Sequence, residues 1–483
     1  MGLSLGGQVG IHDPSTIVEC DGRYYTYGTG GGSLVSDDGW TWRRGVTPAR
    51  TGLAPDLIRL ADRYCLYVAT SGGQPKATIH MIWTKTLDPA SPGYGWNEGG
   101  LIASSDGVED CNAIDPFVFR DPTDGRLWLT YGSYFGYIRL VELDRNTGTR
   151  LNPKDQPRNL AVNCEASAMM YQNGWYYLLA THGSCCRGAD SGYNIRVGRA
   201  KKVTGPYLDN MGVDMIQGGG KLVVGSGGRV VGPGHFGLVD LGDGVQKFSM
   251  HWEADLDRGG ASVLDIRPLL WKDGWPVAGE PVKEGTYEIE SVRTGTALEM
   301  AVEGMPVGGR IARGARGGAG PETGGGRAGA AAGGAGGRGM FAGQGGVIPP
   351  QDAAQVSSNW PSGPVDVRMA NYMCQAQQKW AIAPAADAGG YLGSPYFTIT
   401  IAGTNRALAA SEDAELIVVP AFTGGPEQLW RIDQLADGTW RIMPRAVPKS
   451  TGSLALSAVG SSFATLARFD PTSEKQRWLL KTP

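Results

Sequence analysis

The sequence predicts an all-β chain in which a five-bladed β-propeller precedes a second domain built from threefold internal repeats. Composition gives the first support: the 483 residues include 76 glycines and 14 tryptophans, and this balance, without long helical patterns, is typical of short strands joined by turns. Five hairpin-like units follow one another up to about residue 280, and three evenly spaced Gln-x-Trp triplets come later. A chain of this length is expected to contain two or more domains.

Each of the five units places a motif before a short strand, then a turn, then an aromatic-rich strand. The turns usually pair Asp or Asn with Gly, the strongest short hairpin signal; they lie at Asp21-Gly22, Ala61-Asp62, Asp124-Gly125, Asn173-Gly174 and Asp243-Gly244. A period of roughly 40 to 60 residues predicts a propeller, because each blade is a small sheet around a central channel. The residues expected to converge on the channel axis are Asp13, Asp56, Asp115, Glu165 and His235.

Three of these positions place a carboxylate beside small or rigid residues. Asp13 stands in Ile11-His12-Asp13-Pro14-Ser15, Asp115 in Asn112-Ala113-Ile114-Asp115-Pro116, and Glu165 in Cys164-Glu165-Ala166. A single Asp-Pro is a common turn dipeptide, so the prediction depends on all three motifs together. Carboxylates from three separate β units suit cleavage of a glycosidic bond, in which one carboxyl group donates a proton and another activates water.

Charge and cysteine content exclude several other classes of protein. The formal net charge of -3 and the 19% of charged residues argue against a strongly basic nucleic-acid surface. Seven cysteines cannot form a complete disulfide framework, and adjacent cysteines such as Cys185 and Cys186 rarely form a bridge. The chain has no paired Cys/His spacing that would predict structural zinc. It also has no run of 18 apolar residues that would predict a membrane span.

The second region begins near Tyr287. Its triplets start at Gln378, Gln428 and Gln476, which are 50 and 48 residues apart, and this spacing indicates threefold repetition. We expect each Trp to fill a shared core while each Gln binds backbone, in preference to a sugar contact. Residues 304–347 are rich in Gly, Ala and Arg with Glu322 as their single acid. They are expected to form a flexible insertion in the first repeat, with a nucleic-acid or acidic-glycan role as the alternative.

These motifs resemble a known family. Residues 11 to about 281 resemble glycoside hydrolase family 43, and in particular its α-1,5-L-arabinanase branch. The resemblance includes the three carboxylate motifs, and further matches are Ala54-Pro55-Asp56, Gly232-Pro233-Gly234-His235 and the run from Ser184 to Ala200, which is the most specific to that branch. Residues from about 285 to 480 resemble the ricin-type β-trefoil. The implied fold is a five-bladed β-propeller over 1–282, followed by a β-trefoil over 283–483.

The resemblance implies an inverting mechanism with assigned roles. Asp13 would be the general base, Glu165 the general acid, and Asp115 the group that orients the acid and raises its pKa through its own charge. Inversion requires base and acid to lie about 6.5–9.5 Å apart, which leaves room for water. The expected substrate is α-1,5-arabinan or a related polysaccharide, and the residues expected to bind it are Asp56, Asn112, Ser184, Arg187 and Asn194, with a purely structural loop as the alternative for the last three.

The resemblance also implies an ion and a compartment. His235 would help to hold a hydrated calcium or sodium ion in the channel, because hard cations prefer oxygen and water ligands; a buried histidine bound to backbone is the alternative. No signal peptide is recognisable, and we expect a secreted or periplasmic protein, with a cytoplasmic one as the alternative.

Two alternatives to an arabinan hydrolase remain open. Relatives often carry Trp before Ala-Pro-Asp, where it stacks on the sugar, but this chain has Leu53. The glycan could therefore be a β-xyloside or a galactofuranoside, since a fold does not fix its function. The second alternative is a non-catalytic glycan-binding protein, against which the presence of all three carboxylates argues.

Overall fold

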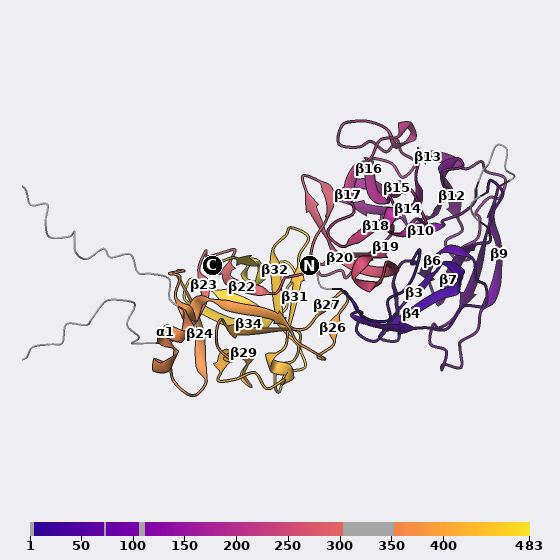
Figure 1. Cartoon of the computed structure of the whole chain (residues 1–483). Helices are drawn as coiled ribbons and strands as arrows, with labels where there is room; N and C mark the ends of the chain where they lie inside the picture. The colour runs from indigo at the N-terminus through magenta and orange to yellow at the C-terminus, as the bar shows by residue number, and fades with distance from the viewer. Residues whose placement is uncertain (1–3, 72–73, 106–111, 303–351) are drawn as a thin grey trace, which may run out of the picture.

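The computed structural model describes residues 4–71, 74–105, 112–302 and 352–483, and it shows two β domains side by side (Figure 1). This confirms the predicted all-β class and its five-bladed propeller followed by a trefoil. The last propeller strand, β21 (Trp275–Ala278), ends just before the first trefoil strand, β22 (Gly285–Ser291). The predicted insertion at 304–347 lies outside the described residues. Within the described ranges, no helix is long and apolar enough to span a bilayer.

The five blades are sheets of antiparallel strands in chain order. Blade 1 consists of β2 (Val18–Cys20), β3 (Arg23–Gly28), β4 (Gly32–Ser36) and β5 (Thr41–Arg44), and β1 (Gly6–Gly7) extends it by pairing with β5 in parallel. Blade 2 consists of β6 (Leu53–Leu60), β7 (Arg63–Ala69), β8 (Thr78–Thr84) and β9 (Asn97–Ser104). Blade 3 consists of β10 (Phe117–Arg120), β11 (Leu127–Tyr131), β12 (Tyr137–Leu143) and β13 (Arg158–Val162).

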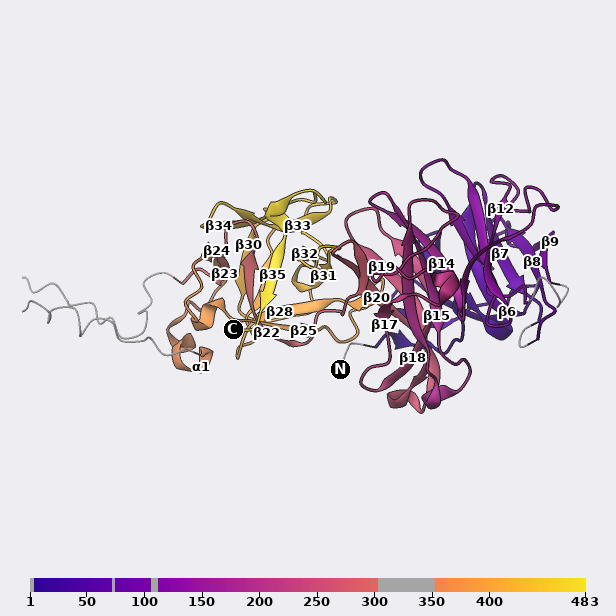
Figure 2. The same ribbon diagram turned by 90° about the horizontal axis from the view of Figure 1, so that it is seen from above.

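Blades 4 and 5 complete the ring, and in Figure 2 the strands of blade 5 lie toward the trefoil while those of blade 2 lie at the far end of the propeller. Blade 4 consists of β14 (Glu165–Gln172), β15 (Trp175–His182), β16 (Asn194–Ala200) and β17 (Lys221–Val224). Blade 5 consists of β18 (Val230–Asp240), β19 (Gln246–Asp255), β20 (Ala261–Lys272) and β21. Alternate side chains of these strands fill the space between neighbouring sheets with aliphatic and aromatic groups.

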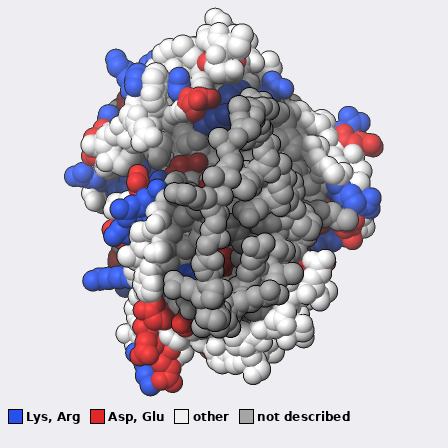
Figure 3. Space-filling view, turned by 90° about the vertical axis from the view of Figure 1, so that its left-hand side faces the viewer, with Lys and Arg blue, Asp and Glu red and all other residues white. Residues whose placement is uncertain are grey.

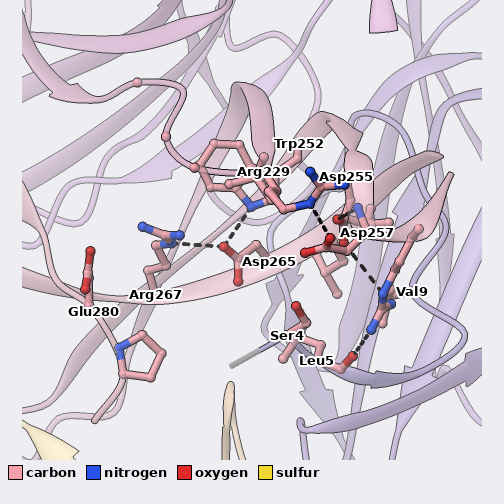
Figure 4. A pocket seen from close by; sticks show the side chains of 18 of the residues that line it. Ser4, Leu5, Val9, Arg229, Trp252, Asp255, Asp257, Asp265, Arg267 and Glu280 are labelled. Atoms are coloured by element: carbon pink, nitrogen blue, oxygen red, sulfur yellow. Dashed lines mark hydrogen bonds and ion pairs between the residues drawn. The ribbon is translucent and has the colours of Figure 1, made fainter. Parts of the chain in front are cut away.

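The N-terminal segment joins blade 5 to blade 1. The backbone N–H of Leu264 donates to Val9 (2.9 Å), while that of Gln8 donates to Trp42 of β5 (2.8 Å). A hollow of about 340 Å³ lies beside this junction (Figure 4). Its basic groups are satisfied locally: Arg267 pairs with Asp265 at 2.9 Å, and the Arg258 guanidinium donates to the Leu5 carbonyl at 2.6 Å. We therefore assign this hollow to ring closure.

The trefoil repeats the same core contact three times. Trp380, Trp430 and Trp478 are 0% exposed, and their indole N–H groups donate to the carbonyls of Leu298 (2.9 Å), Leu408 (3.1 Å) and Leu456 (3.0 Å). The Gln of each triplet accepts a backbone N–H through Oε1, at 2.7, 2.7 and 3.0 Å. The expected structural role of the triplets is therefore confirmed.

The trefoil strands form a single large sheet system closed on itself. Its strands are β22, β23 (Ala297–Met300), β24 (Val365–Ala370), β25 (Trp380–Pro384), β28 (Phe397–Ile401), β29 (Ala407–Ala410), β30 (Leu416–Val419), β31 (Trp430–Gln434), β32 (Trp440–Pro444), β33 (Leu454–Val459), β34 (Phe463–Arg468) and β35 (Trp478–Lys481). The one α-helix among the described residues is α1 (Ala353–Val356). Figure 3 views the trefoil end, where described Lys and Arg are interspersed with Asp and Glu.

A hairpin of the trefoil inserts into the propeller and fixes the junction between the domains (Figure 1). It consists of β26 (Gly390–Tyr391) and β27 (Ser394–Pro395), with Leu392 at its tip. Leu392 is 0% exposed and belongs to the propeller core. Its carbonyl accepts from Lys247 Nζ at 2.6 Å. Gly39 must be glycine there, because its φ is +71° and a Cβ would lie 2.6 Å from Leu392 Cα.

Candidate active site

In every blade, a residue that is not glycine adopts the left-handed backbone conformation shortly before the inner strand or within it. The five residues are Asp13 (φ 50°), Ala54 (44°), Asp115 (53°), Ala166 (47°) and His235 (63°). In blades 2, 4 and 5 the pairing register also shifts at this point. Irregularities of this kind turn side chains away from the sheet and are concentrated at functional sites. Here they direct polar groups toward one end of the channel.

That end holds a hollow of about 390 Å³ in which the three predicted carboxylates meet. Asp13, Asp115 and Glu165 all line it. The remaining lining is His12, Thr29, Leu53, Ala54, Asn112, Ile114, Ser133, Tyr134, Phe135, Ala166, Gly183, Ser184, Cys185, Cys186 and Tyr193. Tyr134 and Phe135 are 39% and 46% exposed. The hollow therefore combines an acidic floor with an apolar rim, a combination that suits a sugar ring.

Asp13 is held in its ionised form. Its Oδ2 lies 2.8 Å from His12 Nδ1 and accepts from the Thr29 hydroxyl at 2.6 Å. His235 Nδ1 lies 3.6 Å from Oδ1. Burial alone would raise the pKa of Asp13, but the hydrogen bond and charge of His12, with a smaller contribution from His235, outweigh burial and hold that pKa well below its usual value. An ionised carboxylate at the hollow can accept a proton from water.

Glu165 has the opposite tendency. Burial, followed by repulsion from Asp13, raises the pKa of Glu165 to about 7, although a hydrogen bond from the Tyr193 hydroxyl opposes that rise. Glu165 therefore keeps its proton under mildly acidic conditions. Two carboxyl groups whose environments push their pKa values apart are the arrangement that acid and base catalysis needs.

Asp115 is 6% exposed, and its Oδ2 accepts the Ala166 backbone N–H at 3.0 Å. Its own pKa is raised, first by burial and then by repulsion from Glu165 and Asp13. Burial, and not the charge of Asp115, is the largest cause of the raised pKa of Glu165 that the resemblance implies, and burial is also the largest cause for Asp115. Since the repulsion between them is mutual, the pair retains a proton over part of the neutral range.

Two of the five predicted substrate-binding residues, Asn112 and Ser184, line the hollow. Asn112 is fully buried, its amide donates to the Gln74 carbonyl at 2.8 Å, and its side-chain oxygen accepts from the Ser133 hydroxyl. Ser184 Oγ accepts the Gly192 N–H at 3.1 Å. Both side chains are thus held in place at the wall of the hollow.

The other three do not line the hollow. Asp56 is 3% exposed, and its carboxylate oxygens accept the backbone N–H groups of Thr16 (3.2 Å) and Val118 (2.8 Å) from the two neighbouring blades. Asn194 donates to Gly192 at 3.0 Å and so closes its own loop. Arg187 is exposed outside the lining. The structure therefore places Asp56 between blades and Asn194 within its own loop, both outside the lining of the hollow.

Residues that the sequence reasoning did not single out surround the carboxylates. His12 and Thr29 contact Asp13, and Tyr193 contacts Glu165. Cys185 and Cys186 form a disulfide, the outcome that adjacency made improbable, and both line the hollow. His12 and Tyr193 stand inside motifs that were recognised, so their positions gave a usable signal, whereas Thr29 follows β3 with no motif of its own.

His235 offers only one protein ligand to an ion. Its backbone N–H donates to Thr181 Oγ1 at 3.1 Å, and its Nδ1 has no hydrogen bond. Among the described residues, the groups of ligand atoms close enough to share an ion are His12, Asp13 and His251, and a second set that includes the disulfide-bonded cysteines. An ion at His235 would therefore be held mainly by water.

The propeller with three carboxylates on its axis defines a glycoside hydrolase. The sequence model for glycosyl hydrolases family 43 matches residues 29–276, and the chain belongs to this family. A second model, described as a ricin-type beta-trefoil lectin domain-like family, matches residues 376–466.

Relatives and solved structures agree with this family. The chain is 33% identical over 307 residues to the extracellular exo-alpha-(1->5)-L-arabinofuranosidase ArbA of Cellvibrio japonicus, covering 56% of this chain and 87% of the relative. It is 32% identical over 292 residues to the extracellular endo-alpha-(1->5)-L-arabinanase 1 of Bacillus subtilis, covering 55% and 87%. A solved exo-1,5-alpha-L-arabinanase from a bovine ruminal metagenomic library is 33% identical, with a TM-score of 0.52 over 57% of this chain and 98% of that one.

Proposed function

We propose that this hydrolase cleaves α-L-arabinofuranosyl linkages of α-1,5-arabinan with inversion of configuration. The observation that carries the proposal is that Asp13 and Glu165 line one hollow with pKa values shifted in opposite directions. Two relatives, an exo-arabinofuranosidase and an endo-arabinanase, suggest the sugar and the linkage.

The reaction follows from the positions of the protons. Glu165 transfers its proton to the glycosidic oxygen as the bond to the anomeric carbon breaks. Asp13 takes a proton from a water molecule, which attacks the same carbon from the opposite face. Asp115 adds a buried acidic group next to the acid, and its Oδ2 accepts the backbone N–H of Ala166, the residue that follows Glu165. The Tyr193 hydroxyl holds the Glu165 carboxyl in place.

The proposal is tested with Asp13→Asn and Glu165→Gln, assayed on debranched arabinan by release of reducing ends. Each is expected to lower kcat by more than about 100-fold, since a general base or acid contributes that much, while the melting temperature stays close to that of the wild type. Asp190→Asn, which changes an exposed acid in the neighbouring loop, should leave kcat unaltered. Wild-type rates in either site variant would refute the assignment.

Product analysis decides between substrates and mechanisms. NMR of the first turnover should show the inverted anomer. Arabinoxylan and a galactofuranan serve as comparators. Faster release of sugar from either polymer would identify that polymer, and not arabinan, as the substrate. Binding to arabinan without release of sugar over hours would instead support a non-catalytic glycan-binding protein.

We further propose that the trefoil attaches the enzyme to its polysaccharide and that the protein acts outside the cell. The lectin-like family match and the extracellular relatives support both points. Retention of the Asp13→Asn variant on insoluble arabinan, with soluble arabinotriose present to occupy the hollow of the propeller, measures attachment through the trefoil. Activity in cell-free culture fluid measures the second point.

The ion at His235 is also a proposal, supported by an unbonded Nδ1 next to the ionised Asp13. The ion would supply positive charge in the channel. A hydrated calcium or sodium ion fits a site that offers one imidazole and otherwise water. Metal analysis of the purified protein, with and without chelator, is expected to find about one equivalent that His235→Ala loses. A metal content that His235→Ala does not change would exclude this site.

A further inference from the structure

Glu253 is a buried carboxylate that contacts two walls of the hollow without lining it. It stands on β19, in which all ten residues are buried, and its side chain is 2% exposed. One oxygen, Oε1, lies 3.0 Å from His12 Nε2 and accepts the Cys186 backbone N–H at 3.1 Å. The same oxygen lies 3.5 Å from His251 Nε2. A buried charge with this many donors around a single atom has a fixed position.

The first of these contacts extends to the base. The His12 ring lies between two carboxylates, because its Nδ1 is 2.8 Å from Asp13 Oδ2 while its Nε2 faces Glu253. Since both ring nitrogens face oxygen atoms, both are assigned as donors. Asp13 Oδ2 also accepts from Thr29 Oγ1 at 2.6 Å. With two donors on Oδ2, Oδ1 is the oxygen left to take a proton from water.

His251 lies between the same two residues, Asp13 and Glu253. Its Nδ1 accepts the Asp13 backbone N–H at 3.1 Å, which assigns its proton to Nε2, the nitrogen that faces Glu253. Its ring lies 4.4 Å from that of His12, centroid to centroid. Glu253 therefore faces two imidazoles that contact Asp13: His12, hydrogen-bonded to Glu253, contacts the side chain, and His251, 3.5 Å away without a hydrogen bond, contacts the backbone.

The second contact extends to the opposite wall. Cys186, whose N–H binds Glu253, has a φ of 63°, a conformation uncommon outside glycine. The disulfide between Cys185 and Cys186 forms part of the hollow, and Ser184 stands beside it. The loop that carries this wall is thus tied to the oxygen that holds His12.

We propose that Glu253 is a positioning residue for hydrolysis: through His12 it orients Asp13 for attack by water, and through the Cys186 N–H it sets the disulfide wall against which the sugar lies. The proposal rests on Asp13 being the general base. It gives Glu253 two separable functions, because orientation of the base acts on the rate of the chemical step, whereas the position of the wall acts on binding.

Two substitutions separate these functions. Glu253→Gln preserves the shape and one acceptor oxygen, so the Cys186 N–H keeps a partner while the charge facing His12 is lost. We expect kcat to fall about tenfold with KM unchanged. Glu253→Leu removes both functions and should lower kcat by about 100-fold, the cost expected when a reacting group is misplaced, and should also raise KM.

The matched control is Asp255→Asn, which changes another buried acid of β19 at the hollow of Figure 4, where Asp255 lies 3.6 Å from the Arg258 guanidinium. Its kcat and KM should equal those of the wild type. If Glu253→Gln matches this control in kcat, the inference is overturned, whether or not Glu253→Leu folds. A Glu253→Gln variant with a raised KM and an unchanged kcat would likewise show that Glu253 does not orient Asp13.

Asp13→Asn, assayed alongside, separates the positioning role of Glu253 from the proposed hydrolysis on which it rests. An inactive Asp13→Asn with a fully active Glu253→Gln would remove only the role of Glu253. An active Asp13→Asn would remove the base assignment itself, and the positioning argument with it.

Discussion

The trefoil and the propeller use repetition in opposite ways. In the trefoil, each repeat has the same residue at the same place, and Trp380, Trp430 and Trp478 make the same hydrogen bond to a leucine carbonyl. In the propeller, equivalent positions share a backbone conformation but carry different side chains: Asp13, Ala54, Asp115, Ala166 and His235. Repeats that agree in sequence build a core here, and repeats that have diverged build the site.

The first prediction tests the packing side of this comparison. Trp430→Ala should lower the free energy of unfolding of the trefoil by about 3–5 kcal/mol, because it leaves a large cavity in a fully buried core. Chemical denaturation followed by tryptophan fluorescence measures this loss. Trp440→Ala, at a half-buried position on the neighbouring strand β32, should cost clearly less. Equal losses at the two positions would mean that the triplet is not the centre of the core.

The repeats also explain how much of the structure the sequence could predict. Asp-Gly and Asn-Gly turns predicted the blades because hairpin geometry is local, and Gln-x-Trp spacing predicted the trefoil because the three contacts are identical. The three carboxylates could be identified because each stands beside a turn-forming or small residue at the start of a blade.

The residues that lie away from the hollow, and those that the sequence did not indicate, depend on geometry that a local pattern does not contain. Asp56 shares the motif position of its counterparts, but it follows Ala54, the left-handed residue, by two positions, whereas Asp13 and Asp115 hold that conformation themselves. Its side chain is therefore directed between blades. Glu253 is 241 residues from His12 in sequence, and nothing near it in the chain indicates that the two meet.

A second prediction concerns the pH dependence of the diverged positions. As pH rises through about 7, Glu165 loses the proton it must donate, so kcat/KM should fall. At low pH activity should persist below the usual aspartate range, because the pKa of Asp13 is depressed and the base stays ionised. The profile of kcat/KM against pH for the free enzyme measures both limbs.

Tyr193→Phe should move the alkaline limb of this profile. Its hydroxyl donates to Glu165 and favours the ionised form, so removing it raises the pKa of Glu165 and shifts the limb to higher pH. Tyr177→Phe, which removes a hydroxyl bound to the Gly274 carbonyl at 2.7 Å, should leave the limb in place. A shift to lower pH in Tyr193→Phe would show that this hydroxyl stabilises the protonated acid instead.

The smallest expected effect is at Leu53, where the chain departs from the pattern it resembles. Leu53 lines the hollow directly before the left-handed Ala54, at a position where a Trp would present an aromatic face to the sugar. Leu53→Trp should tighten binding of arabinohexaose by about 2–10-fold, which corresponds to the roughly 0.5–1.5 kcal/mol of an added aromatic contact. Calorimetry on an Asp13→Asn background measures binding without turnover.

The control is Leu101→Trp, at a residue of β9 that is 55% exposed and does not line the hollow; it should not change the affinity. Weaker binding in Leu53→Trp would indicate that the sugar occupies the space that the leucine leaves open. In that case the departure at Leu53 would itself belong to the specificity of the site, and the rule that diverged repeat positions carry the chemistry would extend to the residue before them.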